Sequence, residues 1–324
     1  MTTRTPRPPR KLRARTPDDV LALVPRLFGF HPQRSLCLLG FGAATFHARV
    51  DLPTSVDDVP AMVDCLDEAL DRQRVDRAVV VVYTTDADLA SPCVQALCAK
   101  LAGRGVEVTA NLRADGQRWF CLRPDGEPCV RGCDPLGTPY DLGSHRLTAE
   151  GVYDGAVVYA NREELRASLR GADASDRGQV EEAVSRLMAR PHEGALWLEG
   201  ETRWLDKNLQ GFLDRPELGS ETVARLAVSL QASAVRDVAW AAMDRASAAS
   251  HVTVWRQVLL RVPDPLAAPP AALLAFAAWL AGDGALAWCA LDRCEEAEPG
   301  YRMAALLTHA LAAALPPSSW RPLR

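Results

Sequence analysis

Long hydrophobic runs are scarce in this sequence of 324 residues. A membrane-spanning helix needs roughly 18 or more consecutive apolar residues. Residues 271–281 are apolar, but Gly282, Asp283 and Gly284 interrupt the run. The basic N-terminus is not followed by the continuous apolar segment of a secretory signal peptide. We therefore expect a cytoplasmic protein that makes no contact with a membrane.

Glycine-rich nucleotide-binding motifs are also missing. The sequence contains neither GxGxxG nor the GxxxxGK pattern of phosphate-binding loops. Gly40 and Gly42 flank Phe41, but they lie between two predicted strands, whereas a dinucleotide motif joins a strand to a helix. These glycines therefore predict a hairpin turn. No catalytic motif is found elsewhere along the chain.

Positive charge is concentrated at the N-terminus. The net charge is −4, from 37 basic and 41 acidic residues. Six of the basic residues fall within residues 1–15, so the rest of the chain carries 31 basic and 41 acidic residues, a net charge of −10. An acidic body does not suit nonspecific binding to nucleic acid. We expect residues 1–15 to be a disordered basic tail, which either binds an acidic partner such as nucleic acid or only aids solubility.

The stretch 16–51 indicates a helix followed by two strands. Thr16 is a good N-cap, Pro17 suits the first helical position, and apolar residues recur at helical spacing up to Phe28. Pro25 is expected to kink this helix or end it early. Residues 35–41 are almost wholly apolar, as in a strand buried on both faces, and residues 45–51 alternate like a half-buried partner.

Two runs of sequence resemble a known family. ARTPDDVLALVPRLFGFHPQRSLCLLG, followed by ARVDLP, is similar to one end of an actinobacterial family catalogued as domain of unknown function 4192. LLAFAAWLAGDGALAWCALDRC, followed by EPGYRMAALL, is similar to its other end. The resemblance extends from about Leu12 to Pro317 and implies no known activity, cofactor or catalytic residue. Arginine outnumbers lysine and alanine is abundant, which favours a GC-rich genome.

The remaining N-terminal half continues as alternating helices and strands. Helices are predicted at 57–73 and 91–102, and strands at 78–83, 106–112 and 117–123. The strand at 78–83 is an unbroken β-branched run, which is typical of a central strand. Together these elements predict an α/β domain with a mixed sheet at residues 16–170.

The C-terminal half is predicted to be all-helical. A polar linker at 171–178 precedes helices near 178–190, 200–213, 220–231, 234–247, 251–261, 270–281, 284–296 and 300–314. Alanine-rich faces and the turn at 282–284 resemble helical hairpins of repeat proteins, so residues 178–316 are predicted to form a repeat-like helical domain. An ordinary helical bundle fits the same pattern.

The first candidate site follows the central strand. Thr84, Thr85 and Asp86 lie just beyond it, and Asn111 and Arg113 end the next parallel strand. Ligands of open α/β sheets bind outside the carboxyl ends of parallel strands, so these side chains are candidates for binding a small polar ligand. The alternative is ordinary loop and capping chemistry, in which threonine and aspartate are common.

The second candidate site is the connector 30–35. His31, Arg34 and Ser35 lie in one short, proline-stiffened segment and are candidates for holding an anion or for acid–base chemistry. The alternative is a structural connector, in which these side chains satisfy backbone groups.

The third candidate site is a group of cysteines. Cys121, Cys129 and Cys133 lie within 13 residues in a predicted loop, and with His145 or Asp134 they are candidates for binding zinc. Their spacing is not the common CxxC knuckle, so packed thiols or a disulfide are alternatives. The other six cysteines are expected to be small core residues: Cys37, Cys65, Cys93, Cys98, Cys289 and Cys294.

Two classes of function fit this sequence. Because no catalytic motif is found, the leading prediction is a non-catalytic, cytoplasmic interaction or regulatory protein whose helical half binds a protein partner. The alternative is an enzyme or small-ligand sensor that uses the polar crevice at the strand ends. A polar pocket with converging titratable groups at those ends would favour the alternative.

Overall fold

The computed structural model describes residues 13–43, 45–129, 133–155, 157–171, 174–189 and 194–322. The expected disordered tail falls largely outside these residues. Contacts divide the described chain into two units. The first unit comprises residues 13–27, 31–67 and 74–158, and the second comprises 28–30, 68–73 and 159–322. No helix among the described residues is long and apolar enough to cross a membrane.

The first unit contains a six-stranded sheet with the order β2-β1-β3-β4-β5-β6. β3 and β4 are parallel, and the other neighbouring pairs are antiparallel, so the predicted mixed α/β sheet is confirmed. The strands are β1 (Ser35–Gly42), β2 (Phe46–Asp51), β3 (Val75–Tyr83), β4 (Glu107–Ala114), β5 (Arg118–Cys121) and β6 (Thr138–Pro139). The short β6 was not predicted, because two residues leave no pattern in the sequence.

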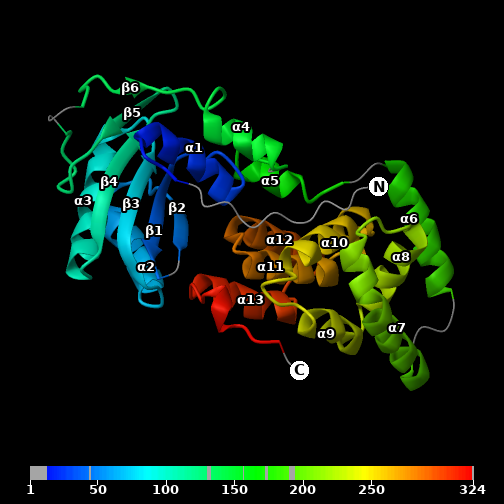
Figure 1. Cartoon of the computed structure of the whole chain (residues 1–324). Coiled ribbons are helices and arrows are strands. Elements are labelled where there is room, and N and C mark those ends of the chain that lie inside the picture. The colour runs from blue at the N-terminus through cyan, green and yellow to red at the C-terminus, as the bar shows by residue number, and fades with distance from the viewer. Residues whose placement is uncertain are drawn as a thin grey trace. The chain divides into compact units, whose positions relative to one another are not determined.

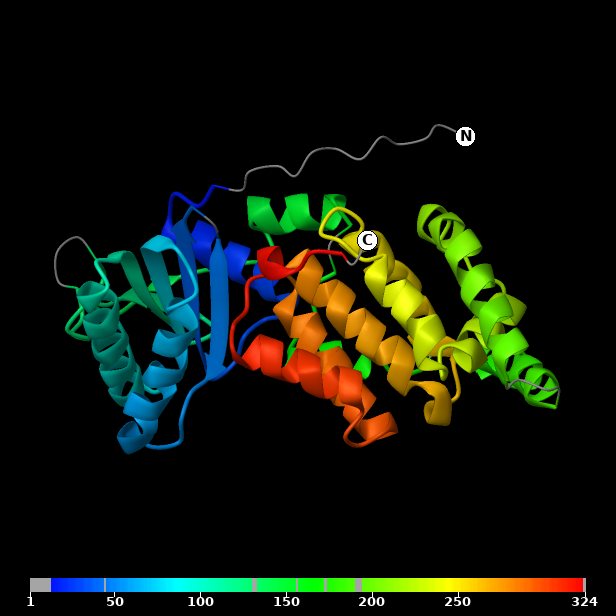
Figure 2. The same cartoon turned by 90° about the horizontal axis from the view of Figure 1, so that it is seen from below.

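Helices cover both faces of the sheet. α2 (Val59–Leu70) and α3 (Ala87–Gly103) lie side by side, with Lys100 Nζ 2.9 Å from Asp64 Oδ1. α1 (Pro17–Phe28) lies across the opposite face (Figures 1 and 2). The central strands β1 and β3 are therefore buried from both sides, as their apolar runs predict.

Gly42 is required where β1 passes β3. A Cβ atom at this position would lie 2.3 Å from the carbonyl oxygen of Arg74. The register of the β1–β3 ladder shifts between Phe41 and Gly42, so the backbones approach closely there. Only glycine leaves room for that approach.

α1 begins at a capping box but does not stop at its proline. Thr16 Oγ1 accepts a hydrogen bond from Asp19 N, and Asp19 Oδ2 accepts one from Arg15 N. The early end expected at Pro25 is wrong, since α1 continues to Phe28, and the alternative of a kink stays a prediction. A proline inside a helix costs about 3 kcal/mol. Burial of Val24 and Phe28, at about 1.5–3 kcal/mol each, offsets that cost.

Two further local expectations are corrected. The helix predicted at 91–102 begins one turn earlier, at Ala87, because the Asp86 carboxylate accepts a hydrogen bond from Leu89 N and caps it there. Pro92 then lies inside the helix. Cys65 was expected in the core but is exposed, because it lies on the outward side of α2.

The second unit is helical, which confirms the predicted helical region; its repeat-like character stays a prediction. Its helices are α5 (Arg162–Ala167), α6 (Ala174–Met188), α7 (Ala195–Asp214), α8 (Ser220–Ser229), α9 (Ser233–Ala241), α10 (Ala248–Arg261), α11 (Ala268–Ala281), α12 (Gly284–Ala297) and α13 (Arg302–Ala312). Every residue of α11 from Ala268 to Leu280 is buried, and α10 and α12 pack along it (Figure 1). An apolar surface on all sides is typical of a core helix.

A turn predicted from sequence joins α11 to α12. Gly282 takes a left-handed conformation with φ of 84°, which closes α11. The Asp283 side chain then accepts a hydrogen bond from Leu286 N and caps α12. The Gly-Asp-Gly sequence therefore ends one helix and starts the next within three residues.

A buried histidine lies in the core of the second unit. His251, on α10, is fully buried, and its Nδ1 accepts a hydrogen bond from Trp255 Nε1 at 3.2 Å. Burial lowers the pKa of His251 to about 4, although the nearby charge of Asp244 opposes the shift. The imidazole is therefore neutral in the folded protein at pH 7.

This histidine predicts that the fold weakens in mild acid. The unfolded pKa is near 6.5, so its contribution is complete above pH 6.5 and declines as the pH falls towards 4, by up to about 3 kcal/mol. His251→Gln keeps an acceptor for Trp255 but does not titrate. Urea unfolding at pH 7 and pH 4.5 should therefore show a smaller loss of stability in His251→Gln than in the wild type. The exposed His309→Gln variant is the control, and an equal loss in all three proteins would contradict the assignment.

Candidate functional site

The crest after β3 is occupied by helix-capping interactions. Thr84 is buried, and its Oγ1 accepts a hydrogen bond from Asp86 N at 3.0 Å. Asp86 in turn caps α3, while Thr85 is exposed. The Thr84 amide donates to Ala114 O at 2.9 Å and extends the parallel pairing beyond β3. Thr84 and Asp86 thus make capping contacts of the kind that the alternative described, and ligand binding at the crest stays a prediction.

Asn111 and Arg113 lie on the same face of β4 but in different environments. Asn111 Oδ1 accepts a hydrogen bond from the Cys98 thiol of α3 at 3.3 Å. The Arg113 guanidinium stacks on the Phe120 ring, 3.8 Å from its centroid, and donates to Thr84 O. Burial lowers the pKa of Arg113. The structure thus joins Arg113 to the crest and places Asn111 beneath α3.

The connector 30–35 is also held by hydrogen bonds that involve backbone groups. Ser35 is fully buried, donates to Gln33 O at 2.6 Å and accepts from Arg49 Nε at 3.0 Å. His31 and Arg34 are exposed. Arg34 O accepts a hydrogen bond from Leu52 N, which ties the start of β1 to the end of β2. These contacts match the structural alternative for this segment.

Arg34 has a left-handed backbone, with φ of 42°. This conformation costs an L-residue with a side chain roughly 1–2 kcal/mol, and glycine avoids that cost but loses more backbone entropy on folding. We expect Arg34→Gly to raise the free energy of unfolding by about 0.5 kcal/mol. Arg34→Ala, which retains the strain, should give no gain. Chemical denaturation of the three proteins measures the difference, and a loss of stability in the glycine variant would show that the Arg34 side chain makes a stronger contact.

Three cysteine sulfurs converge at the edge of the sheet. The Sγ atoms of Cys121, Cys129 and Cys133 all lie within 4.8 Å of one another, and each residue is half-buried. Burial, followed by the neighbouring thiols, raises the pKa of Cys121 to about 12. The sequence prediction named these three residues, and the structure brings their ligand atoms together.

Backbone pairing holds this thiol cluster in place. Cys121 ends β5, and its carbonyl accepts a hydrogen bond from Cys129 N at 2.9 Å. The turn between them contains Gly126, with φ of 85°, whose Cα approaches Ser91 so closely that a Cβ atom would lie 2.4 Å from Ser91 O. Cys133 begins the segment that leads back to β6. Each thiol therefore stands at a different point of the β5–β6 connection.

His145 and Asp134 have other partners. His145 caps α4 (Arg146–Tyr153) by accepting a hydrogen bond from Leu147 N, and its Nε2 lies 3.4 Å from Asp19 Oδ1. Asp134 Oδ1 accepts a hydrogen bond from Leu136 N. The group of ligand atoms within 4.8 Å of one another, among the described residues, consists of the three sulfurs alone.

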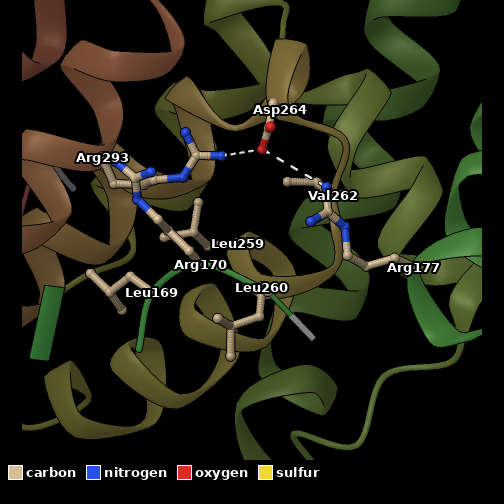
Figure 3. A pocket seen from close by; sticks show the side chains of 9 residues that line it. Leu169, Arg170, Arg177, Leu259, Leu260, Val262, Asp264 and Arg293 are labelled. Carbon is tan, nitrogen blue, oxygen red and sulfur yellow. Dashed lines mark hydrogen bonds and ion pairs between the residues drawn. The ribbon is translucent and has the colours of Figure 1, made fainter. Parts of the chain in front are cut away.

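A small hollow in the second unit is lined by three arginines (Figure 3). Its volume is about 120 Å³, and its lining comes from the residues that follow α5, from α6 and α12, and from the end of α10 with the residues that follow it. Arg293 and Arg177 both pair with Asp264 Oδ1, the latter at 3.8 Å. Arg170 extends alongside Arg293, and leucines of α10 form the floor (Figure 3).

Positive charges outnumber negative charges among the residues that line this arginine hollow. Asp264 lies between Arg177 and Arg293, and Arg170 pairs with Glu296. Burial alone would raise the pKa of Glu296, but hydrogen bonds from Arg166 and Arg170 outweigh it and lower that pKa. Three arginines thus face one lining carboxylate. The side chain of Arg293 is 11% exposed, and its Nε has no hydrogen-bond partner among the described residues.

Sequence reasoning missed the arginine hollow. Arg170, Arg177, Asp264 and Arg293 span more than 100 positions and form no motif. In a chain rich in arginine, no local signal distinguishes these residues from the others. Only the packing of α6, α10 and α12 with the segments that follow α5 and α10 brings them together.

The fold and these sites define a class of protein with two units. A mixed α/β unit carries a thiol cluster at its sheet edge, and a helical unit carries an arginine-lined hollow. The chain belongs to the family described as Domain of unknown function (DUF4192), whose model matches residues 17–318. No curated protein matches the chain, and neither does any solved structure.

Proposed function

We propose that this protein is a non-catalytic regulatory protein that binds a small oxyanion in the arginine hollow. The observation that carries the proposal is the convergence of Arg170, Arg177 and Arg293 on one hollow with a single lining carboxylate. Guanidinium groups bind carboxylate and phosphate oxygens through paired hydrogen bonds. The Nε of Arg293 is a buried donor without a hydrogen-bond partner among the described residues, and an oxyanion would supply an acceptor for it.

The size of the hollow supports a small ligand. Pockets for drug-sized molecules and cofactors have volumes of about 300–1,000 Å³. The arginine hollow, at about 120 Å³, instead suits inorganic phosphate or the carboxylate of a small metabolite. The capping roles of Thr84 and Asp86 support the non-catalytic part of the proposal, because both side chains already accept backbone hydrogen bonds at the start of α3.

Anion binding is tested by removing either the lining carboxylate or an arginine. Asp264→Asn deletes the internal anion that competes for Arg177 and Arg293, so phosphate should bind several-fold more tightly. Arg170→Gln removes one cation and should bind several-fold more weakly. Thermal unfolding across a phosphate titration measures this, since a ligand at 100 times its Kd stabilises the fold by about 2.7 kcal/mol.

Matched controls accompany that titration. Arg203→Gln removes an exposed arginine of α7 that pairs with Glu199 outside the hollow, and it should behave like the wild type. Acetate in place of phosphate distinguishes a carboxylate ligand from a phosphate ligand. A wild type that neither anion stabilises, or an Asp264→Asn variant with unchanged affinity, would refute the proposal.

The regulatory role includes a protein partner in the cytoplasm. In place of the helical half expected from the sequence, we propose the end of α4, in the first unit, as its docking surface. Val152, Tyr153 and Val157 are 72%, 70% and 65% exposed, which places three large apolar side chains within six residues.

Buried thiols such as Cys37, Cys93 and Cys289 suit the reducing cytoplasm. The resemblance and the arginine-rich composition support an actinobacterial source.

Site-specific cross-linking tests the docking surface. A photo-reactive side chain at Tyr153 should give one discrete cross-linked product in cells of the source organism. The same group at Leu196, an isolated exposed leucine of α7, is the control and should give none. Equal labelling from both positions, or none from Tyr153, would count against a partner at this surface.

A further inference from the structure

The thiol cluster has the composition and spacing of a metal site. Three cysteine sulfurs lie within 4.8 Å of one another, a backbone hydrogen bond joins Cys129 to Cys121, and none of the three belongs to a regular CxxC motif. Soft thiolate ligands select zinc over the hard cations magnesium and calcium. Zinc binds thiolate sulfur at about 2.3 Å in tetrahedral geometry, which places the sulfurs about 3.8 Å apart. The cluster therefore needs to contract by no more than about 1 Å to enclose the ion.

We propose that Cys121, Cys129 and Cys133 bind one Zn²⁺ ion as thiolates, with water as the fourth ligand. The fourth position falls to water because His145 caps α4 and contacts Asp19, and Asp134 accepts the Leu136 amide. Three protein ligands and one open position differ from the closed, four-ligand arrangement of most structural zinc sites.

Zinc binding by these thiols balances in atoms and in charge, and it needs no oxidant or reductant. Three thiols and one aqueous Zn²⁺ give one zinc tris-thiolate and three released protons. Both sides carry the same charge, since the complex is −1 and the protons are +3. No bond is oxidised or reduced. A disulfide, in contrast, joins two of the three sulfurs, requires an oxidant and leaves the third thiol unused.

The surrounding loop favours metal binding over simple packing of thiols. Among the described residues of the β5–β6 connection, Leu122 is buried but Leu136 is 77% exposed. Gly126 and Gly137 let the connection press against Ser91 and the Phe120 ring, at distances that a Cβ atom would not permit. An ion bridging β5, the hairpin return and the segment before β6 would tie these parts of the connection together.

Metal analysis of the full chain tests the site. Protein purified with a phosphine reductant should contain about one zinc per chain by elemental mass spectrometry. A Cys129→Ser, Cys133→Ser double variant should lose it. Cys65→Ser is the matched control, because Cys65 is an exposed thiol on α2 outside the cluster, and it should retain the full zinc content.

A second measurement uses the wild type and does not depend on the folding of any variant. After removal of zinc with a chelator, added Co²⁺ should give a near-ultraviolet sulfur-to-cobalt absorption with the intensity of three thiolates. Zinc should then slow alkylation of Cys121, Cys129 and Cys133 at least tenfold and leave Cys65 unchanged. Metal-free protein whose thiols react at the same rate with and without zinc would overturn the proposal. So would a disulfide between two of the three cysteines in protein freshly purified without a reductant.

Discussion

Burial of β1 and β3 on both faces is the constraint on which the first unit depends. Leu36, Leu38, Val80 and Val82 are fully inaccessible to solvent. Each contributes about 1.5–3 kcal/mol when removed from water, so a strand left uncovered on one face would lose several such contributions. The sheet is therefore stable only with α1 on one face and α2 with α3 on the other. Local penalties such as Pro25 and Pro92 inside helices are small beside this burial.

The same constraint decides what the polar residues near the strand ends do. A helix that must begin directly over the sheet needs its first amides satisfied. Asp86 does this for α3, and Thr84 fixes the turn that leads to Asp86. A crest that looks like a ligand site in the sequence thus serves to start a covering helix. Ser35 plays a comparable part, since its hydroxyl links Gln33 and Arg49 at the start of β1.

Groups with unused chemical capacity lie away from the central strands. The thiol cluster stands at the β5 edge of the sheet, where the chain leaves regular pairing and backbone conformation is set by glycines. The arginine hollow lies among the helices of the second unit, where Asp264 satisfies two arginines and leaves Arg293 Nε without a partner among the described residues. Both sites contain side chains whose thiol or guanidinium groups are not fully taken up by contacts within their unit.

The sequence by itself determined the class of fold and most of its elements. Apolar runs identified β1 and β3, the threonine and proline at 16–17 identified the start of α1, and the Gly-Asp-Gly turn separated α11 from α12. Such signals are local, because periodicity and capping act over a few residues. The three loop cysteines were also visible as a candidate site, since they fall within 13 residues of one another.

Tertiary structure decided the features that depend on distant residues. The sequence could not choose between Asp86 as a ligand and Asp86 as a cap, because the choice rests on where α3 begins over the sheet. It gave no sign of the arginine hollow, whose charged residues come from α6, α12, the segment after α5 and the segment after α10. It offered His145 as a fourth zinc ligand, but pairing with Asp19 of α1 holds that ring elsewhere. Long-range packing brings these groups together, and local sequence patterns do not predict that packing.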